Sequence, residues 1–227
     1  MTLSNAALKR LAKLKRKKYR EESRLFLAEG ENLIREATVP PEHLLTNDHA
    51  VKQLSTLTTP TGPTAVFSFL DVPATEVLEE RDLVVFLHGV QDPGNVGTII
   101  RAAHAFRAGV ALSTGTADLY NPKTVRATMG SIFRVPVARD VDYALFLNEA
   151  KTRNFVTVAA MARGGEHPST LTAEKLVILV GAEGGGLPEE VISACAKTVT
   201  IPLLAESLNV AVASSILLYE AYSRVLT

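Results

Sequence analysis

The chain has little cysteine and no long apolar run, and both absences narrow its class. A single cysteine, Cys195, excludes a disulfide within the chain and is more typical of a packed core than of a reactive thiol. No apolar run reaches the roughly 18 to 20 residues of a membrane span. The basic N-terminus lacks the apolar segment and cleavage site of a signal peptide. With 47% apolar residues, the composition predicts a globular, cytoplasmic protein without a membrane partner.

Signatures of metal and nucleotide sites are missing as well. The glycine-rich stretch 181–186 carries Glu183 where a dinucleotide fingerprint needs its second glycine, and no Gly-Lys-Ser/Thr follows as in a P-loop. An acid at a strand end would also repel phosphate, which disfavours a nucleoside triphosphate. No Gly-x-Ser-x-Gly elbow is present. The histidines lack the spacing of metal ligands, so no metal site is predicted; they are His43, His49, His88, His104 and His167.

The net charge is zero, but the charges are unevenly distributed. Residues 1–24 hold nine Lys and Arg residues against Glu21 and Glu22, and the rest of the chain is acidic by the same amount. Such asymmetry favours a polyanionic partner, with Lys13, Arg16 and Lys17 as phosphate contacts that add affinity but little sequence information. A solvated charged helix or a disordered arm would have the same composition, so the charge alone leaves these interpretations open.

Two segments with different patterns divide the chain into two predicted domains. The first, 1–75, is expected to be a small α/β domain that begins with a basic helix over 5–18. Its strands are expected at 26–28, 44–46 and 65–70, with a helix at 31–37. Residues 71–81 hold Pro73 and several acids and are expected to form a linker.

The second domain, 76–227, alternates apolar runs with helical segments. Continuous apolar runs suit strands that are covered on both faces of a parallel sheet, so the fold class predicted is an open α/β sheet with right-handed crossovers. The last helix is apolar nearly all round, which predicts that it is buried in a core or in a subunit interface. The expected strands are 83–87, 110–112, 155–159 and 176–180; the expected helices are 95–108, 121–130, 142–152, 188–197 and 208–226.

Three turns that join strand-like to helix-like segments carry polar groups beside small residues. Ligand sites of α/β proteins lie where strands end and helices begin, so these turns predict one composite site. Asn95 and Ser207 are also good helix N-caps, and the glycines also fit a tight turn, so purely structural roles stay open. The turns are Asn95-x-Gly97-x-x-x-Arg101, the loop 181–187 with Glu183, and Ile201-Pro202 followed by Ser207-Leu208-Asn209.

Arg101 is the hardest of these residues to explain by structure alone. In a helix its neighbours at three and four residues include the small Gly97, Thr98 and Ala105, while most other positions are apolar. An arginine with space around its base is suited to meet an anion or a substrate, although a surface arginine is the alternative.

Taken together, these motifs resemble those of the SpoU (TrmH-type) RNA ribose 2′-O-methyltransferases of the SPOUT superfamily. NVGTIIRAA, LVGAEGGGL and IPLLAESLNVAVASSILLYEA are similar to the three family motifs in their usual order, and NPKTVRATMGSIFRVPV is similar to a family segment between them. In the N-terminal part, FLAEGENLIREA and LSTLTTPTGPTAVF resemble the substrate-binding domain of many ribosomal-RNA members.

The resemblance implies a fold, a cofactor and an assembly. The fold would be an α/β open, mostly parallel sheet with a C-terminal trefoil knot, preceded by a small α/β substrate-binding domain. The cofactor would be S-adenosyl-L-methionine, with the backbone around Leu179, Gly181, Ile201 and Leu208 lining the adenosine pocket. The enzyme would be a homodimer through the last helix.

The resemblance also implies roles for single residues. Arg101 would lie next to the ribose hydroxyl and its phosphate, while Arg126 and Arg134 would contact RNA phosphates. The side chains that would orient Arg101 and the ribose are Asn95, Glu183, Ser207 and Asn209. The expected reaction is methylation of a ribose in structured RNA, with ribosomal RNA favoured over transfer RNA. A non-catalytic RNA-binding or ribosome-assembly protein is the alternative.

Overall fold

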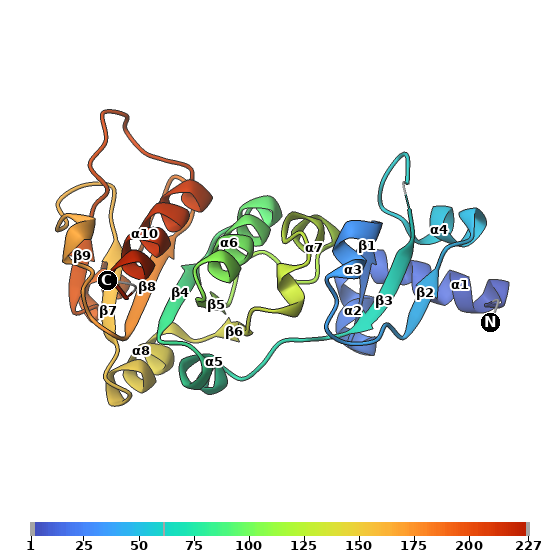
Figure 1. Ribbon diagram of the computed structural model, residues 1–227, viewed down its shortest axis with the longest axis horizontal. Coiled ribbons are helices and arrows are strands. Elements are labelled where there is room, and N and C mark those ends of the chain that lie inside the picture. Colours follow the sequence, from blue (N-terminus) through green and yellow to red (C-terminus); the bar gives the residue numbers. More distant parts are fainter. Residues whose placement is uncertain (1–2, 61, 226–227) are drawn as a thin grey trace.

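The N-terminal part of the chain forms a three-stranded antiparallel sheet covered by short helices (Figure 1). The computed structural model describes residues 3–60 and 62–225; residue 226, the end of the expected last helix, lies outside this part, as do 1, 2, 61 and 227. Strand β3 is central, because both β1 and β2 pair with it. The elements are α1 (Asn5–Ala12), a 3-10 turn (Lys13–Lys15), α2 (Lys17–Ser23), β1 (Leu25–Glu29), α3 (Glu31–Arg35), β2 (His43–Leu45), α4 (Asp48–Leu54) and β3 (Thr64–Ser68).

The basic N-terminal segment is broken, in contrast to the single helix expected over 5–18. Leu8, Leu11 and Leu14 are buried on one side, as the periodicity predicted. The helix nevertheless ends at Ala12, and Arg16 adopts an extended conformation before α2 begins. On a continuous helix Lys13 would lie one turn from both Arg16 and Lys17, and repulsion between like charges disfavours that arrangement.

Two further helices correct the expectations for this half. Helix α4 was not predicted; the side chain of Asn47 caps it by accepting hydrogen bonds from the amides of His49 and Ala50. The expected linker 71–81 contains helix α5 (Ala74–Glu80), which buries Val77 and Leu78. A proline at the N-cap starts this helix rather than preventing it.

The C-terminal part is built on a six-stranded, fully parallel sheet in the order β6-β5-β4-β8-β7-β9. The four predicted strands are present and occupy the middle. Of the two edge strands, β6 was not predicted, and β9, the strand-like segment expected before the turn at Ile201-Pro202, ends at Val199. The strands are β4 (Leu83–His88), β5 (Gly109–Ser113), β6 (Val137–Val141), β7 (Val156–Ala160), β8 (Leu176–Gly181) and β9 (Lys197–Val199).

Helices cover both faces of this sheet (Figure 1). Side chains of α6 and α10 share one core with Val85 and Ile178, whereas α5, α8 and α9 share a second core with Phe86 and Leu179. Alternate residues of one strand therefore serve opposite cores, which explains why the strands are apolar throughout. The helices are α6 (Pro93–Ala105), α7 (Pro122–Ala127), α8 (Tyr143–Thr152), α9 (Glu189–Ala194) and α10 (Val210–Val225), with 3-10 turns at Ser131–Phe133 and Pro168–Thr170. No helix in the described residues is long and apolar enough to span a bilayer.

The two parts of the chain are packed tightly against each other. Phe26 and Phe67 of the small sheet belong to the same apolar core as Tyr120 and Phe133 of the large domain. The ring centroids of Phe26 and Tyr120 are 4.9 Å apart, and those of Phe67 and Phe133 are 4.8 Å apart. The small domain is therefore held in one orientation by a continuous core.

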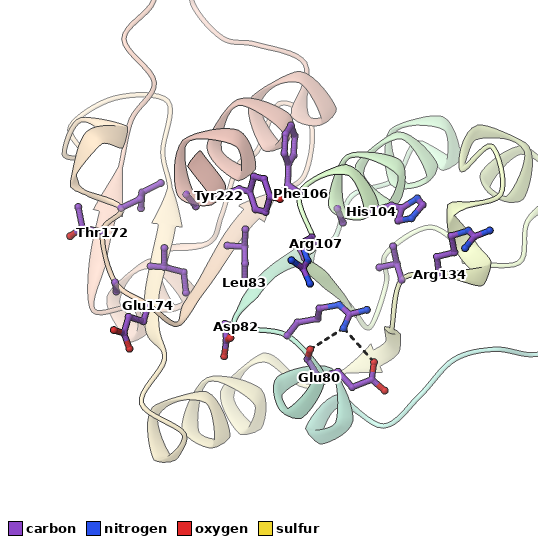
Figure 2. A pocket seen from close by; sticks show the side chains of 18 of the residues that line it. Glu80, Asp82, Leu83, His104, Phe106, Arg107, Arg134, Thr172, Glu174 and Tyr222 are labelled. Atoms are coloured by element: carbon purple, nitrogen blue, oxygen red, sulfur yellow. Dashed lines mark hydrogen bonds and ion pairs between the residues drawn. The ribbon is translucent and has the colours of Figure 1, made fainter. Parts of the chain in front are cut away.

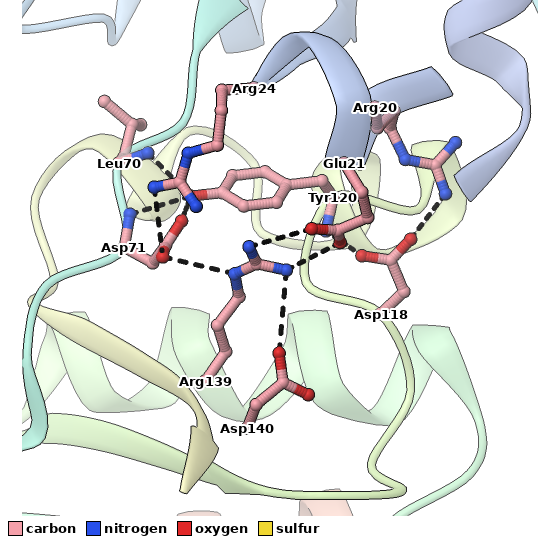
Figure 3. Close-up of polar contacts among 9 residues, drawn as sticks. All are labelled: Arg20, Glu21, Arg24, Leu70, Asp71, Asp118, Tyr120, Arg139 and Asp140. Atoms are coloured by element: carbon pink, nitrogen blue, oxygen red, sulfur yellow. Dashed lines mark hydrogen bonds and ion pairs between the residues drawn. The ribbon is translucent and has the colours of Figure 1, made fainter. Parts of the chain in front are cut away.

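Buried polar contacts lie next to this core, at the junction between the two parts of the chain (Figure 3). The Tyr120 hydroxyl donates to Asp71 Oδ1 at 2.6 Å and accepts from the amides of Leu70 at 2.6 Å and Asp71 at 2.7 Å. Burial works to raise the pKa of Asp71, but the Tyr120 hydrogen bond and the charge of Arg139 outweigh it and lower this pKa. Burial and Asp71 together raise the pKa of Tyr120 far above its usual range, so the phenol stays neutral.

Ion pairs tie the basic segment to the same junction. Arg139 of β6 forms two hydrogen bonds with the carboxylate of Glu21, at 2.6 and 3.0 Å. Arg20 is buried; it pairs with Asp118 of the large domain and donates to the carbonyl of Leu14 at 2.7 Å. Helix α2 is thus anchored at its buried side, while the cations of the segment remain at its surface.

Candidate active site

The three predicted turns meet at the carboxyl edge of the parallel sheet. Strands β4 and β8 are neighbours in register, so His88 lies beside Gly181 and the two following turns start side by side. The third turn follows β9, and α10 then returns across the sheet to pack against α6. This return brings the start of α10 next to the start of α6.

A hydrogen-bond network connects all three turns. The Asn95 amide Nδ2 donates to Glu183 Oε1 at 2.7 Å, and the Asn209 amide Nδ2 donates to Asn95 Oδ1 at 3.1 Å. The other oxygen of Glu183 accepts from the backbone amide of Gln91 at 3.2 Å. Burial works to raise the pKa of Glu183, but the bonds from Asn95 and from backbone amides lower it overall. An ionised Glu183 therefore fixes the orientation of Asn95.

The structure assigns the helix caps differently from the sequence. Asp92, rather than Asn95, caps α6 by accepting from the amide of Asn95 at 3.0 Å. Asn209, rather than Ser207, caps α10 by accepting from the amides of Ala211 and Val212. Because α10 starts at Val210, Ser207 lies in the preceding loop, exposed and without a hydrogen-bond partner among the described residues.

The glycine loop after β8 folds back on itself. Ala182 and Gly186 form an antiparallel bridge, and the amide of Gly186 donates to the carbonyl of Ala182 at 2.9 Å. A Cβ atom at Gly181 would lie only 2.1 Å from the carbonyl carbon of Gly186. At Gly185, by contrast, a Cβ atom would meet nothing within 4 Å. One side of the loop is closed by its own backbone, and its tip is open to an approaching molecule.

The predicted cofactor residues occupy different depths around this loop. Gly181 ends β8, Ile201 is half-buried, and Leu208 is exposed on the loop before α10, as is Leu204. Leu179 lies two residues inside β8, with neighbouring strands on both sides and its side chain fully buried. The side chain of Leu179 therefore faces the core, and the expectation for this residue concerns its backbone alone.

Arg101 is exposed on α6 and is not part of the network. It makes no hydrogen bond or ion pair within 3–60 and 62–225. His104 does not accompany it, because its ring nitrogen contacts Ser131 Oγ at 3.2 Å. Arg101 lies three residues after Thr98, which borders a small apolar hollow between α6 and α10.

The predicted RNA contacts fall into two groups. Lys13, Arg16 and Lys17 are exposed on the basic segment. Arg126 and Arg134 instead bind carboxylates of the small domain: Arg126 contacts Glu29 at 3.0 Å and Arg134 contacts Glu36 at 3.2 Å. The guanidinium of Arg126 in particular is directed at a carboxylate of the same chain rather than at solvent.

A large cavity lies at the opposite edge of the sheet (Figure 2). It has a volume of about 1150 Å³ and is bordered by Leu83 and Leu176, the first residues of β4 and β8, and by the last turns of α6 and α10. None of its lining residues belongs to the three turns, so this cavity is separate from the candidate site. The described residues contain no cluster of side chains suited to a metal ion.

Two residues of the site were missed from the sequence. The side chain of Gln91 donates to the carbonyls of Gly89 at 3.2 Å and Gly115 at 2.5 Å. Its backbone amide donates to Glu183 Oε2 at 3.2 Å. Asp92 caps α6 and pairs with Lys123 at 2.7 Å, and this contact lowers the pKa of Asp92. Asp followed by Pro at the first helical position was the signal for the cap.

Comparison with known proteins places this chain in a family. Residues 82–219 match the SpoU rRNA Methylase family, and residues 5–60 match the MRM3-like substrate binding domain. The chain therefore belongs to the SpoU rRNA methylase family.

Relatives and solved structures match nearly the whole chain. It is 33% identical over 240 residues, 95% of either chain, to the 23S rRNA (guanosine(2553)-2'-O)-methyltransferase RlmP of Bacillus subtilis (strain 168). An AdoMet-bound rRNA methyltransferase from Sinorhizobium meliloti has a TM-score of 0.90 and 30% identity, covering 100% of this chain and 98% of that one. The SpoU methyltransferase AviRb from Streptomyces viridochromogenes, in complex with AdoMet, has a TM-score of 0.87 and 25% identity over 99% of each chain. The family predicted from the motifs is confirmed, as is the α/β fold with its parallel sheet.

Proposed function

We propose that this chain transfers the methyl group of S-adenosylmethionine to a ribose 2′-hydroxyl of ribosomal RNA. Family membership and the names of its relatives support the reaction and the RNA class. The observation that carries the proposal is the network that joins Asn95, Glu183 and Asn209, because it assembles the three family motifs at one edge of the sheet.

The residues around the glycine loop fit the cofactor. The adenosine part needs backbone that can approach closely and apolar side chains that can cover a ring. The open tip at Gly185 offers the first, and exposed Leu204 and Leu208 offer the second. We propose that the backbone around Leu179, Gly181, Ile201 and Leu208 lines this pocket, while the side chain of Leu179 packs in the core below it.

The chemistry follows from the charges of the chain. When bound, S-adenosylmethionine supplies a methyl group on a sulfonium centre. A guanidinium is a permanent cation, so the side chain of Arg101 is suited to bind the adjacent phosphate and to stabilise the alkoxide that develops on the ribose oxygen. Asn95, held by ionised Glu183, and Asn209 orient the ribose, and Ser207 adds a hydroxyl from the neighbouring loop. Alignment of the oxygen with the methyl carbon accounts for several further kcal/mol of the barrier.

Exposed residues indicate where the chain binds RNA and where two copies of it associate. Exposed Lys13, Arg16 and Lys17, with half-exposed Arg134, bind phosphates. The match to a substrate-binding domain favours ribosomal over transfer RNA. Val212 and Tyr219 line the hollow between α6 and α10 and are each about half exposed. These exposed apolar side chains support a homodimer through α10, with Arg101 near the interface.

Two finer features belong to the same proposal. The return of α10 across the sheet, from the edge strand β9 to α6, supports a trefoil knot in this part of the chain. A cytoplasmic location follows from the proposed substrate, because it is there that ribosomal RNA would be encountered.

The experiment is transfer of labelled methyl to unmethylated ribosomal and transfer RNA. Arg101→Lys keeps the charge and loses the planar fork, so its turnover is expected to fall about 100-fold or more. Arg153→Lys, on the opposite face of the sheet, is the matched control and is expected to be unchanged. Equal turnover of Arg101→Lys and the unaltered chain would refute the role of Arg101. Label in transfer RNA alone would refute the substrate class, and cofactor binding without transfer to either would favour a non-catalytic RNA-binding protein.

A further inference from the structure

Arg126 connects the small domain to the large one through a buried carboxylate. It lies in α7, and its Nη1 donates to Glu29 Oε1 at 3.0 Å and to Thr56 Oγ1 at 2.7 Å. The Glu29 side chain is only 4% exposed, whereas that of Arg126 is 29% exposed. The contact between Arg126 and Glu29, called the joint below, has a defined geometry, because the planar guanidinium fixes direction as well as distance.

Glu29 in turn fixes the start of a surface loop. Its carboxylate accepts from Ser55 Oγ at 2.5 Å and from Thr56 Oγ1 at 2.6 Å, and also from the amide of Thr56 at 3.2 Å. The residues that follow, 56–59, are exposed and rich in threonine hydroxyls. The position of this loop therefore depends on the same carboxylate that Arg126 holds.

On its other side, α7 lies directly against the helix that carries the motif residues. A Cβ atom at Gly97 of α6 would lie 2.5 Å from both the Ala127 Cβ and the Thr124 carbonyl oxygen. The two helix backbones are thus in contact, and neither can shift without the other. Helix α6 carries Asn95 and Arg101, so a stiff path runs from the loop 56–59 through Glu29, Arg126 and α7 to the candidate active site.

We propose that Arg126 is a positioning residue: it fixes the loop 56–59, which belongs to the segment that matches a substrate binding domain, and so sets where bound RNA lies relative to Arg101. This role rests on the proposed function and adds to it a contact that determines which nucleotide of the RNA is methylated. It differs from the phosphate contact expected from the sequence, because the partner of Arg126 is a carboxylate of the same chain. Loosening the joint would let the bound RNA move past Arg101 while the cofactor loop stays unchanged.

The two roles make opposite predictions for Glu29→Gln. If Arg126 positions the loop, removal of the negative charge weakens its contact with Glu29 and impairs transfer as Arg126→Gln does. If Arg126 binds phosphate, Glu29→Gln releases it and RNA affinity rises. Arg126→Lys, which keeps the charge on a shorter side chain, provides a milder variant should Arg126→Gln fail to fold. Arg153→Gln is the matched control, because Arg153 is also 29% exposed and pairs with two acids, Glu79 and Glu149.

The experiment compares these full-length variants in methyl transfer to unmethylated ribosomal RNA, with mapping of the methylated nucleotide. Arg126→Gln and Glu29→Gln are each expected to lower kcat/KM about 10- to 100-fold, mainly through KM for RNA, and to methylate neighbouring nucleotides. The double variant is expected to be no worse than either single one, because both changes break one joint. Affinity for S-adenosylmethionine is expected to be unchanged, as is every property of Arg153→Gln.

Hydrogen exchange supplies a readout that does not depend on activity. Amides of 55–59 are expected to exchange faster in both joint variants, and those of α10 are not. Transfer to the same nucleotide at the unaltered kcat/KM in both variants would overturn the positioning role, and so would tighter RNA binding by Glu29→Gln. Lack of methyl transfer by the unaltered chain would overturn the proposed function, and the positioning role with it.

Discussion

Substitution of Gly181 by alanine tests whether the glycine loop has the closed geometry on which the cofactor site depends. The new Cβ would lie 2.1 Å from the Gly186 carbonyl carbon, 2.2 Å from its oxygen and 2.4 Å from the Leu187 nitrogen. Ordinary carbon contacts begin near 3.5 Å, so the loop must open by roughly 1.4 Å. All three atoms are backbone, and no flexible side chain can move away instead.

The cost can be converted into a melting temperature. Forced overpacking typically costs about 1–3 kcal/mol. For a chain of this size each kcal/mol lowers Tm by about 2–4 °C, so Gly181→Ala is expected to melt about 2–12 °C lower. Its affinity for S-adenosylmethionine, measured by calorimetry, is expected to fall as well, because the loop no longer closes.

Gly185→Ala is the matched control in the same loop. Its Cβ would meet nothing within 4 Å and its φ lies outside the left-handed region. Because the substitution also restricts the unfolded chain, its Tm is expected to stay the same or to rise slightly. Equal melting temperatures for Gly181→Ala and Gly185→Ala would show that the described loop geometry is wrong.

Three further predictions concern the junction, the surface and the thiol. Because the folded-state pKa of Asp71 is lowered, its contribution to stability is full above about pH 4 and is lost as the pH falls through that lowered pKa; acid unfolding curves of Asp71→Asn should lack this loss. Val212→Asp on α10 should shift the protein to monomers in analytical ultracentrifugation, whereas Leu145→Asp on the exposed side of α8 should not; a monomeric unaltered chain would refute the interface. Burial, opposed by Lys151, raises the pKa of Cys195 to about 11, so its alkylation near pH 8 should be roughly two orders of magnitude slower than that of a free thiol; an ordinary rate would contradict this burial.

The central strands could be predicted because they are buried on both faces. Residues such as Val85 and Phe86 face opposite cores, so both must be apolar and the run is continuous. The edge strands β6 and β9 lack this signal, because they pair on one side only and expose residues such as Asp140 and Lys197. Their assignment depends on contacts with distant strands.

Helix ends were predicted less accurately than helices. Pro73 and the following acids suggested a linker, but they begin α5, whose stability comes from burying Val77 and Leu78 against the large domain. The caps of α6 and α10 were each placed on a neighbouring polar residue, since Asp92, Asn95, Ser207 and Asn209 all have suitable side chains. Only the tertiary contacts decide which of them caps.

The site was predicted as a set of residues but not as a geometry. Motif order identified Asn95, Glu183 and Asn209, which the structure joins across sequence separations of 88 and 114 residues. The partners of Arg126 could not be predicted, because Glu29 lies 97 residues away in another domain. A sequence shows that an arginine can bind an anion, and it does not show which anion the fold presents.

The central claim is that the chain methylates a ribose 2′-hydroxyl, and the position of the transferred methyl group tests it most directly. Unmethylated ribosomal RNA is treated with the protein and labelled S-adenosylmethionine and then hydrolysed in alkali, which cleaves only where a free 2′-hydroxyl can attack the adjacent phosphate. The account predicts label in an alkali-resistant dinucleotide, formed by the unaltered chain and lost in Arg101→Ala. Label released in mononucleotides would place the methyl group on a base and would contradict the account.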